Sequence, residues 1–322
     1  MKMNWMSRRK QAEFFNVDKN IFVELFPHEI ESRMQKSNPK HPLRPRQKQN
    51  KPGEEGKMKP LPVFDYPKSD GSGRLQNKIA FITGGDSGIG KAVAILFAKE
   101  GADISIVYLN ESKDAEETKN IIEREYKRKC LLIATDISKE RSCINAVKKA
   151  VKTYGRIDIL VNNAAVHWES KSLEEISTKQ LVKTFETNIF SYFWITKAAL
   201  PSMRKGSTII NTTSVTAYRG STDLIDYAST KGAIVSFTRS LAHNLIEKGI
   251  RVNAVAPGPI WTPLVVSTFD GDKVAKHGSD VPMKRAGEPV EVAPSFLFLA
   301  CEDASYITGQ VLHPNGGEIV NG

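Results

Sequence analysis

The chain has 322 residues, of which 40% are hydrophobic, and this apolar content is enough for the packed core of a globular enzyme. Three widely spaced cysteines exclude a disulfide framework and a C-x-x-C metal or redox site, which is typical of a reducing cytoplasm. No apolar run is long enough for a membrane span, and charges interrupt the N-terminus where a secretion signal would need an apolar core. We therefore expect a cytoplasmic protein without a metal site.

The net charge of +10 is concentrated at one end of the chain. Residues 1–75 contain 16 Lys and Arg against 9 Asp and Glu, so they hold most of the excess. The rest of the chain has a charge that is ordinary for an enzyme. Because no nucleic-acid-binding motif or aromatic platform accompanies the basic residues, nucleic acid is not the favoured partner.

The first 76 residues form a predicted basic, proline-rich arm. Eight of the sixteen prolines lie between Pro27 and Pro67, in a stretch with few apolar residues. Such a segment cannot bury enough surface to fold alone, so we expect it to lie on the body or on a neighbouring subunit. Binding of nucleic acid by this arm is the alternative. The spaced positive charges are Lys40, Arg44, Arg46, Lys48 and Lys51.

From Asn77 onward, short β-branched runs alternate with longer amphipathic stretches, a pattern that predicts a parallel sheet covered by helices. We expect one α/β domain over 77–322, with a doubly wound, seven-stranded parallel sheet of the Rossmann type. The predicted strands are 78–83, 103–108, 130–135, 157–162, 208–213, 250–256 and 310–313.

A glycine-rich loop follows the first predicted strand. The strand 79–82 leads into T-G-G-D-S-G-I-G at 83–90, and 91–99 has the pattern of a helix. Glycines let the backbone approach a pyrophosphate, and a helix N-terminus offers free N–H groups and partial positive charge. A tight turn without a ligand is the alternative. The predicted cofactor contacts of this loop are Gly84, Asp86, Ser87, Gly88, Ile89 and Gly90.

A candidate catalytic group lies further along. Tyr227 and Lys231 are four residues apart, so on a helix they share a face, and Ser214 ends the strand 208–213. Ligands in open α/β sheets lie at the carboxyl ends of strands. A lysine cation about 5 Å from a phenol is worth roughly 3 kcal/mol, or about two pKa units, so we expect Tyr227 to titrate near working pH. The alternative is an ordinary Tyr and Lys pair on a helix.

The order of these motifs resembles the short-chain dehydrogenase/reductase family. The loop has the spacing T-G-x-x-x-G-x-G, Asn162-Asn163-Ala164-Ala165 follows the fourth strand, Asn188 lies in a helix, and Pro257-Gly258 follows the sixth strand. Residues 47 to 75 look like the proline-bearing arm of a bacterial branch. The resemblance implies hydride transfer between NAD(P) and a carbonyl or alcohol substrate.

The same resemblance implies roles for individual residues. Ser214 would hydrogen-bond the substrate oxygen, and Tyr227 would transfer the proton. Lys231 would bind the nicotinamide ribose, and Asn188 would hold a water that relays protons. Asn162 would steady both sheet and cofactor. The further implied cofactor contacts are Tyr108, Asn110, Asp136, Ile137, Ala164, Pro257, Gly258, Ile260 and Thr262, together with Tyr227 and Lys231.

The choice between NAD and NADP stays open. Family members that prefer NAD usually end the second strand with an Asp, but this position is Tyr108. Leu109 and Asn110 follow, where NADP users often have Arg or Lys. Asn110 is able to bond a 2′-hydroxyl, while the missing acid removes repulsion of a 2′-phosphate.

The remaining expectations concern the pocket and the assembly. Residues 261–283 are predicted to form a mobile lid over the substrate. His167 and Trp168 either line the same pocket or pack under the lid. The apolar helix 180–203 favours a subunit contact, and the resemblance implies a dimer or tetramer that 314–322 could join. The alternative function is a catalytically silent NAD(P)-binding sensor or scaffold.

Overall fold

The computed structural model describes residues 42–66 and 70–320, and these contain one seven-stranded parallel sheet. The strand order is β3-β2-β1-β4-β5-β6-β7, which confirms the predicted doubly wound Rossmann type. The strands begin and end within two residues of the predicted positions. They are β1 (Ile79–Thr83), β2 (Asp103–Tyr108), β3 (Cys130–Ala134), β4 (Ile159–Asn162), β5 (Thr208–Thr212), β6 (Arg251–Val255) and β7 (Val311–Leu312).

The strand order reverses between β1 and β4, which pair in parallel with Ala80 opposite Ile159 and Ile82 opposite Val161. All five residues of β1 are buried, so this central strand is covered on both faces. In an open α/β sheet, ligands bind beyond the carboxyl ends of the strands at such a reversal. The fold therefore places a binding site next to the loops that follow β1 and β4.

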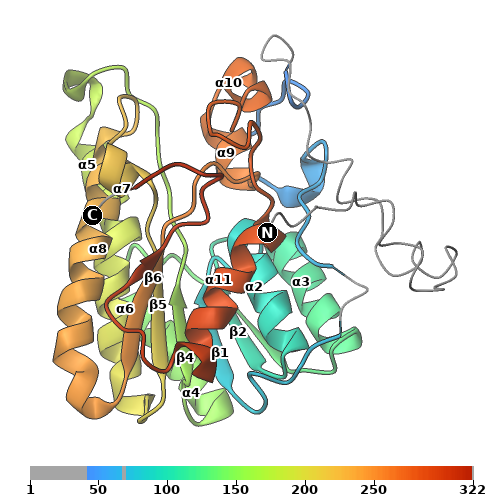
Figure 1. Cartoon of the computed structure of the whole chain (residues 1–322), viewed down its shortest axis with the longest axis vertical. Helices are drawn as coiled ribbons and strands as arrows, with labels where there is room; N and C mark the ends of the chain where they lie inside the picture. Colours follow the sequence, from blue (N-terminus) through green and yellow to red (C-terminus); the bar gives the residue numbers. More distant parts are fainter. Residues whose placement is uncertain (1–41, 67–69, 321–322) are drawn as a thin grey trace, which may run out of the picture. The chain divides into compact units, whose positions relative to one another are not determined.

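Helices cover both faces of the sheet, and each face has its own apolar cluster. Figure 1 shows α2 (Gly88–Lys99), α3 (Ser112–Arg124) and α11 (Pro289–Ala300) together on one side. Helices α4 (Glu140–Tyr154), α6 (Ser191–Ala199) and α8 (Ile225–Leu245) pack on the other. None of the helices in the described ranges is long and apolar enough to cross a membrane. The shorter helices are η2 (Glu55–Lys57), η3 (Leu173–Glu175), α5 (Thr178–Phe185), η5 (Leu200–Ser202), α7 (Thr216–Arg219), η6 (Ile246–Lys248), α9 (Pro263–Thr268), α10 (Gly271–Ala275) and η7 (Glu302–Ala304).

The helix expected over 180–203 is present as an unbroken helical run over 178–202, but its hydrogen-bonding repeat changes along the run. Helix α5 ends at Phe185, a π turn (η4) covers Glu186–Phe190, and α6 begins at Ser191. A π turn inserts one residue into the helical repeat and is frequent at functional sites. Here it contains Asn188, which is fully buried.

The described part of the arm, residues 42–66, packs on the body. Met58 is 2% exposed and belongs to an apolar cluster with Trp261 and other lid residues. The Trp261 indole N–H donates to the Pro60 carbonyl oxygen at 2.9 Å, and the Arg44 guanidinium lies 4.3 Å from the Trp261 ring centroid. In Figure 1 this segment, coloured blue, lies beside α9 and α10. The arm up to residue 41 is outside the described residues.

The close approach of α2 to the loop after β1 can be tested with a matched pair of glycine substitutions. A Cβ at Gly90 would lie 1.8 Å from the Gly84 carbonyl oxygen, whereas a Cβ at Gly232 in α8 meets nothing within 4 Å. We expect Gly90→Ala to destabilise the protein by more than about 2 kcal/mol, because the backbone has to move. Gly232→Ala should leave stability unchanged or raise it by up to about 1 kcal/mol. Urea unfolding measures both, and equal midpoints would contradict the prediction.

Candidate active site

A cavity of about 850 Å³ lies at the carboxyl edge of the sheet, between the glycine loop and the lid segment 261–283. Its size is within the usual range of cofactor and substrate sites. Most of the site residues expected from the sequence line it. These are Gly84, Asp86, Ser87, Gly88, Ile89, Tyr108, Asp136, Ile137, Ala164, Ser214, Tyr227, Lys231, Pro257, Gly258, Ile260 and Thr262.

Four expected site residues lie outside the cavity lining: Gly90, Asn110, Asn162 and Asn188. Asn162 is fully buried, and its amide donates to the Asn211 Oδ1 at 2.9 Å, so it links β4 to β5 below the cavity. Asn162 thus steadies the sheet, and the cofactor contact expected of it stays a prediction. Asn110 is exposed at the surface beyond β2.

The glycine loop has the shape that a dinucleotide needs. Gly84 and Gly88 have positive φ values of 63° and 53°, a conformation that favours glycine. A Cβ at Gly84 would lie 3.1 Å from the Ala164 Cα, and one at Gly88 would lie 3.1 Å from the Thr262 Cγ2. Helix α2 begins at Gly88, so its positive end lies at the cavity and suits a pyrophosphate. The residues present therefore fit a nicotinamide dinucleotide.

Asn163 connects the ends of three strands beneath this loop. Its Nδ2 donates to the carbonyl oxygens of Thr83 at 3.1 Å and Gly84 at 3.2 Å, and its Oδ1 accepts from the Thr212 hydroxyl at 3.2 Å. Its backbone N–H donates to the Thr83 hydroxyl at 2.9 Å. Asn163, rather than Asn162, thus shapes the cavity wall. Asn163 was not among the predicted site residues, although the pair of Asn residues in the motif could have indicated it.

The structure brings Ser214, Tyr227 and Lys231 together at the cavity. Ser214 follows β5, and its hydroxyl hydrogen-bonds the Tyr227 phenol. Lys231 lies one turn further along α8, with its Nζ 5.3 Å from the Tyr227 ring centroid. The same Nζ donates to the Thr212 carbonyl oxygen at 2.8 Å, which orients the lysine along the cavity wall.

The expected lowering of the phenol pKa by Lys231 is not found. Burial raises the pKa of Tyr227 to about 12, and the hydrogen bond with Ser214 only partly opposes this shift. Burial also lowers the pKa of Lys231 to about 7. Loss of hydration disfavours the charged form of each side chain and is the largest cause of both shifts. The phenol therefore keeps its proton at neutral pH.

The Asn188 side chain makes three hydrogen bonds within the protein. Its Oδ1 accepts from the Val166 N–H at 2.9 Å, and its Nδ2 donates to the Val166 carbonyl at 2.8 Å and the Thr230 hydroxyl at 3.2 Å. The amide thus holds the loop after β4 against α8. The Oδ1 accepts only this one bond among the described residues, so the water expected at Asn188 stays a prediction.

His167 and Trp168 both line the cavity. His167 is 5% exposed, and its ring centroid lies 4.9 Å from that of Tyr227 and 5.5 Å from that of Phe269. Burial lowers the pKa of His167 well below its usual value, so the imidazole is neutral. Neither ring nitrogen has a hydrogen-bond partner among the described residues. A neutral donor and acceptor thus lies beside the phenol.

Two groups of cavity residues were missed by the sequence analysis. Lys51, Pro52 and Gly53 of the arm line the cavity, and a proline-rich segment without periodicity offers no signal for such a contact. Glu111 also lines it, three residues beyond β2, and its Oε1 is buried without a hydrogen-bond partner in the described ranges. An acid this close to the expected ribose position was a signal that could have identified it.

Comparisons with known proteins agree with this geometry. A family model described as "Enoyl-(Acyl carrier protein) reductase" matches residues 84–318. YhxC, an oxidoreductase of Bacillus subtilis, is 58% identical over 283 residues, which cover 88% of this chain and 98% of the relative. This chain belongs to the short-chain dehydrogenase/reductase family. It is therefore an NAD(P)-dependent oxidoreductase.

Two further members illustrate the range of this short-chain dehydrogenase/reductase family. An Arabidopsis thaliana protein named NADPH-dependent aldehyde reductase 1, chloroplastic, is 53% identical over 284 residues, 86% of this chain and 98% of its own. The crystal structure of a Burkholderia cenocepacia short-chain dehydrogenase in complex with NADP is 31% identical, with a TM-score of 0.72. It covers 76% of this chain and 98% of its own chain.

The burial of Lys231 predicts a pH-dependent stability difference. Its pKa falls from 10.5 to about 7 on folding, so the cost of its charge is fully present below pH 7 and disappears as the pH rises toward 10.5. We expect Lys231→Met to stabilise the fold by about 2 kcal/mol at pH 6 and by less at pH 9. Urea unfolding across this range measures the difference. The control Lys197→Met, at an exposed position of α6, should show no such trend, and a gain that grows with pH would contradict us.

Proposed function

We propose that this enzyme transfers hydride between nicotinamide and the carbon of a carbonyl or alcohol substrate, with Tyr227 as the acid and base. The observation behind the proposal is the convergence of Ser214, Tyr227 and Lys231 on a cavity that the glycine loop also lines. The bound cofactor supplies the hydride, and the protein supplies the proton and the orientation. Positioned acid catalysis of this kind contributes about 10²- to 10⁴-fold to the rate.

The protonation state of Tyr227 favours reduction at neutral pH. With a pKa of about 12, its phenol holds a proton that it can donate to a carbonyl oxygen. The Ser214 hydroxyl, which hydrogen-bonds this phenol, is placed to bond the same oxygen. The neutral His167 imidazole beside the phenol adds a polar group next to the reacting carbon. A small carbonyl compound is therefore the proposed substrate, in line with the aldehyde reductase name of the Arabidopsis relative.

Separate parts of the cavity would hold the ends of the cofactor. The loop from Gly84 to Gly88 would hold the pyrophosphate, and Lys231 would bond the nicotinamide ribose. Asp136 and Ile137 after β3 would lie at the adenine, and 257–262 would cover the nicotinamide. Both NAD and NADP remain candidates, and the Burkholderia relative was crystallised with NADP.

We further propose a cytoplasmic homo-oligomer, a dimer or a tetramer. The cysteines Cys130, Cys143 and Cys301 are buried and free, which suits a reducing compartment. Phe190 and Phe193, on consecutive turns around the start of α6, are 43% and 51% exposed. Apolar surface of this kind favours a subunit contact. Nucleic acid is not a proposed partner, because no docking motif accompanies the basic arm.

Replacing the phenol tests the proposed chemistry. We expect Tyr227→Phe to lower kcat by at least about 10³-fold while cofactor binding stays within about threefold, because only the proton donor is removed. Steady-state kinetics over a panel of aldehydes, together with fluorescence titration of NADH and NADPH, measure both quantities. Unchanged turnover would exclude the role of Tyr227. Tight cofactor binding by the wild type without turnover would favour the sensor or scaffold function instead.

The Glu111 Oε1, which is buried without a partner among the described residues, predicts a shift in cofactor preference. A carboxylate near the adenosine ribose accepts bonds from a 2′-hydroxyl and repels a 2′-phosphate. We expect Glu111→Gln to raise the ratio of kcat/KM for NADPH to that for NADH by about tenfold, whichever cofactor the wild type prefers. Lys113→Met, nearby on α3 and outside the cavity lining, serves as a control of opposite charge change. A ratio that stays constant in Glu111→Gln would place this carboxylate away from the ribose.

A further inference from the structure

The arm contributes directly to the wall of the active-site cavity. Lys51, Pro52 and Gly53 line it on the side of the lid segment. Gly53 is buried so closely against this segment that a Cβ would lie 2.6 Å from the Pro263 carbonyl oxygen. The backbone of the arm therefore packs directly on the backbone of α9, and only glycine leaves room for this contact.

Lys51 connects three parts of the protein at this point. Its Nζ donates to the His167 carbonyl oxygen at 2.6 Å and to the Thr268 hydroxyl. His167 belongs to the loop after β4, and Thr268 ends α9 in the lid segment. The Lys51 Nζ also lies 5.5 Å from the Trp168 ring centroid. One arm side chain thus bonds both segments, which also contact each other where the Thr268 hydroxyl donates to the His167 carbonyl oxygen at 3.4 Å.

Only two contacts separate Lys51 from the reacting group. Lys51 bonds the backbone of His167, and the His167 ring packs edge-on against Tyr227 with centroids 4.9 Å apart. The same imidazole packs on Phe269, the first residue after α9. A shift of the His167 backbone would therefore move the group that lies beside the phenol.

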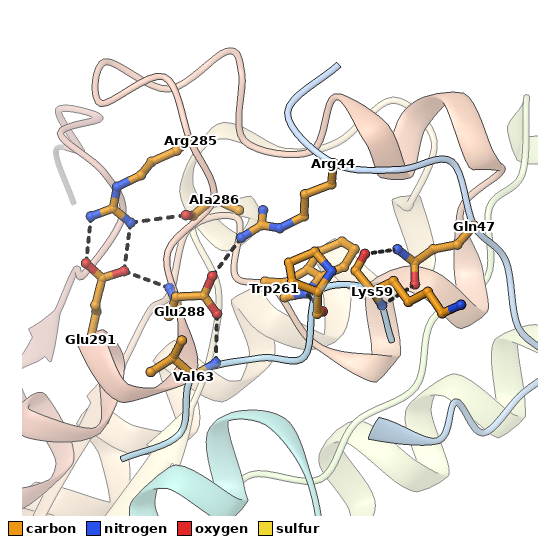
Figure 2. Close-up of polar contacts among 10 residues, drawn as sticks. Arg44, Gln47, Lys59, Val63, Trp261, Arg285, Ala286, Glu288 and Glu291 are labelled. Atoms are coloured by element: carbon orange, nitrogen blue, oxygen red, sulfur yellow. Dashed lines mark hydrogen bonds and ion pairs between the residues drawn. The ribbon is translucent and has the colours of Figure 1, made fainter. Parts of the chain in front are cut away.

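The arm is anchored on both sides of Lys51. On one side, Arg44 forms a half-buried ion pair with Glu288 at 2.7 Å, and Figure 2 shows its guanidinium between Glu288 and Trp261. On the other, the buried Glu55 accepts from the Gly88 N–H and from the Lys91 Nζ, each at 2.7 Å. Segments held at both ends have little freedom left in the middle, so Lys51 is preorganised.

The arm is an addition to the common fold of the family. The match with the Burkholderia structure covers 98% of that protein but only 76% of this chain. Residues 77–322 make up a similar share of this chain. The Bacillus relative matches 283 residues, more than 77–322 contains, so its similarity extends into the arm. Hydride transfer in the family therefore does not require an arm, and its role here lies elsewhere.

We propose that Lys51 is a positioning residue that fixes the His167 loop and the lid segment around the carbonyl substrate, so that the arm completes the substrate side of this active site. The inference rests on the proposed carbonyl reduction. Misplacement of groups around a reacting centre by about 1 Å is able to cost up to about 10²-fold in rate. Binding of the cofactor through the glycine loop should be almost independent of Lys51.

Three variants test this role: Lys51→Met, Lys51→Arg and the control Lys57→Met, which removes an exposed arm lysine paired with Glu54. The substrate is the aldehyde with the highest kcat/KM for the wild type. We expect Lys51→Met to lower kcat/KM for this aldehyde by about tenfold or more, with the Kd of the cofactor within about twofold and Tm unchanged. In Lys51→Arg the guanidinium can still donate to both the His167 carbonyl and the Thr268 hydroxyl, so kcat/KM should be within about threefold of the wild type.

Hydrogen exchange supplies a readout that does not depend on turnover. In Lys51→Met, and not in Lys57→Met, peptides that cover 165–169 and 264–270 should exchange faster. The proposal is overturned if Lys51→Met equals Lys57→Met in exchange and in kcat/KM, or if its cofactor affinity and Tm fall in parallel with activity. A wild type that reduces no aldehyde would contradict the proposed function, and unchanged exchange would separately show that Lys51 does not hold the two segments.

Discussion

Parallel pairing of β1 with β4 is the constraint on which the site depends. This pairing sets the glycine loop next to the loop after β4, so that Gly84 almost touches Ala164 and the amide of Asn163 bonds both Thr83 and Gly84. Backbone N–H groups and helix dipoles bind an anion only if they are held in place before it arrives. The part-buried bonds of Asn163 meet this need, because they tie the ends of β1, β4 and β5 to one side chain.

Burial determines the proton chemistry as much as charge does. At the phenol, loss of water raises the pKa to about 12, and at the neighbouring ammonium it lowers the pKa to about 7. The raised pKa of Tyr227 keeps the phenol protonated at neutral pH and so favours it as a proton donor. A buried lysine with one backbone partner is also costly for the fold, so this part of the molecule exchanges stability for catalysis.

The arm packs on the lid segment and so forms part of the folded enzyme. Its apolar contact, Met58, joins Trp261 and the apolar residues of α9 in one cluster, so the lid segment is packed from both sides. Val266 of the predicted lid is fully buried in this cluster. The ion pairs of Arg44 with Glu288 and of Glu55 with Lys91 then fix the position of the arm along this surface. A segment too polar to fold alone is thereby ordered by the surface that it covers.

Sequence alone determined the features that rest on local spacing. Alternation of apolar runs located all seven strands, and the glycine loop predicted the α2 N-terminus. The spacing of four positions from Tyr227 to Lys231 put both on one face of α8. Tertiary structure decided what depends on distant neighbours: the π turn at Asn188, the inward turn of Asn162 away from the cavity, and the placement of Lys51. It also reversed the expected pKa of Tyr227, because burial is a property of the whole fold and no spacing along the chain encodes it.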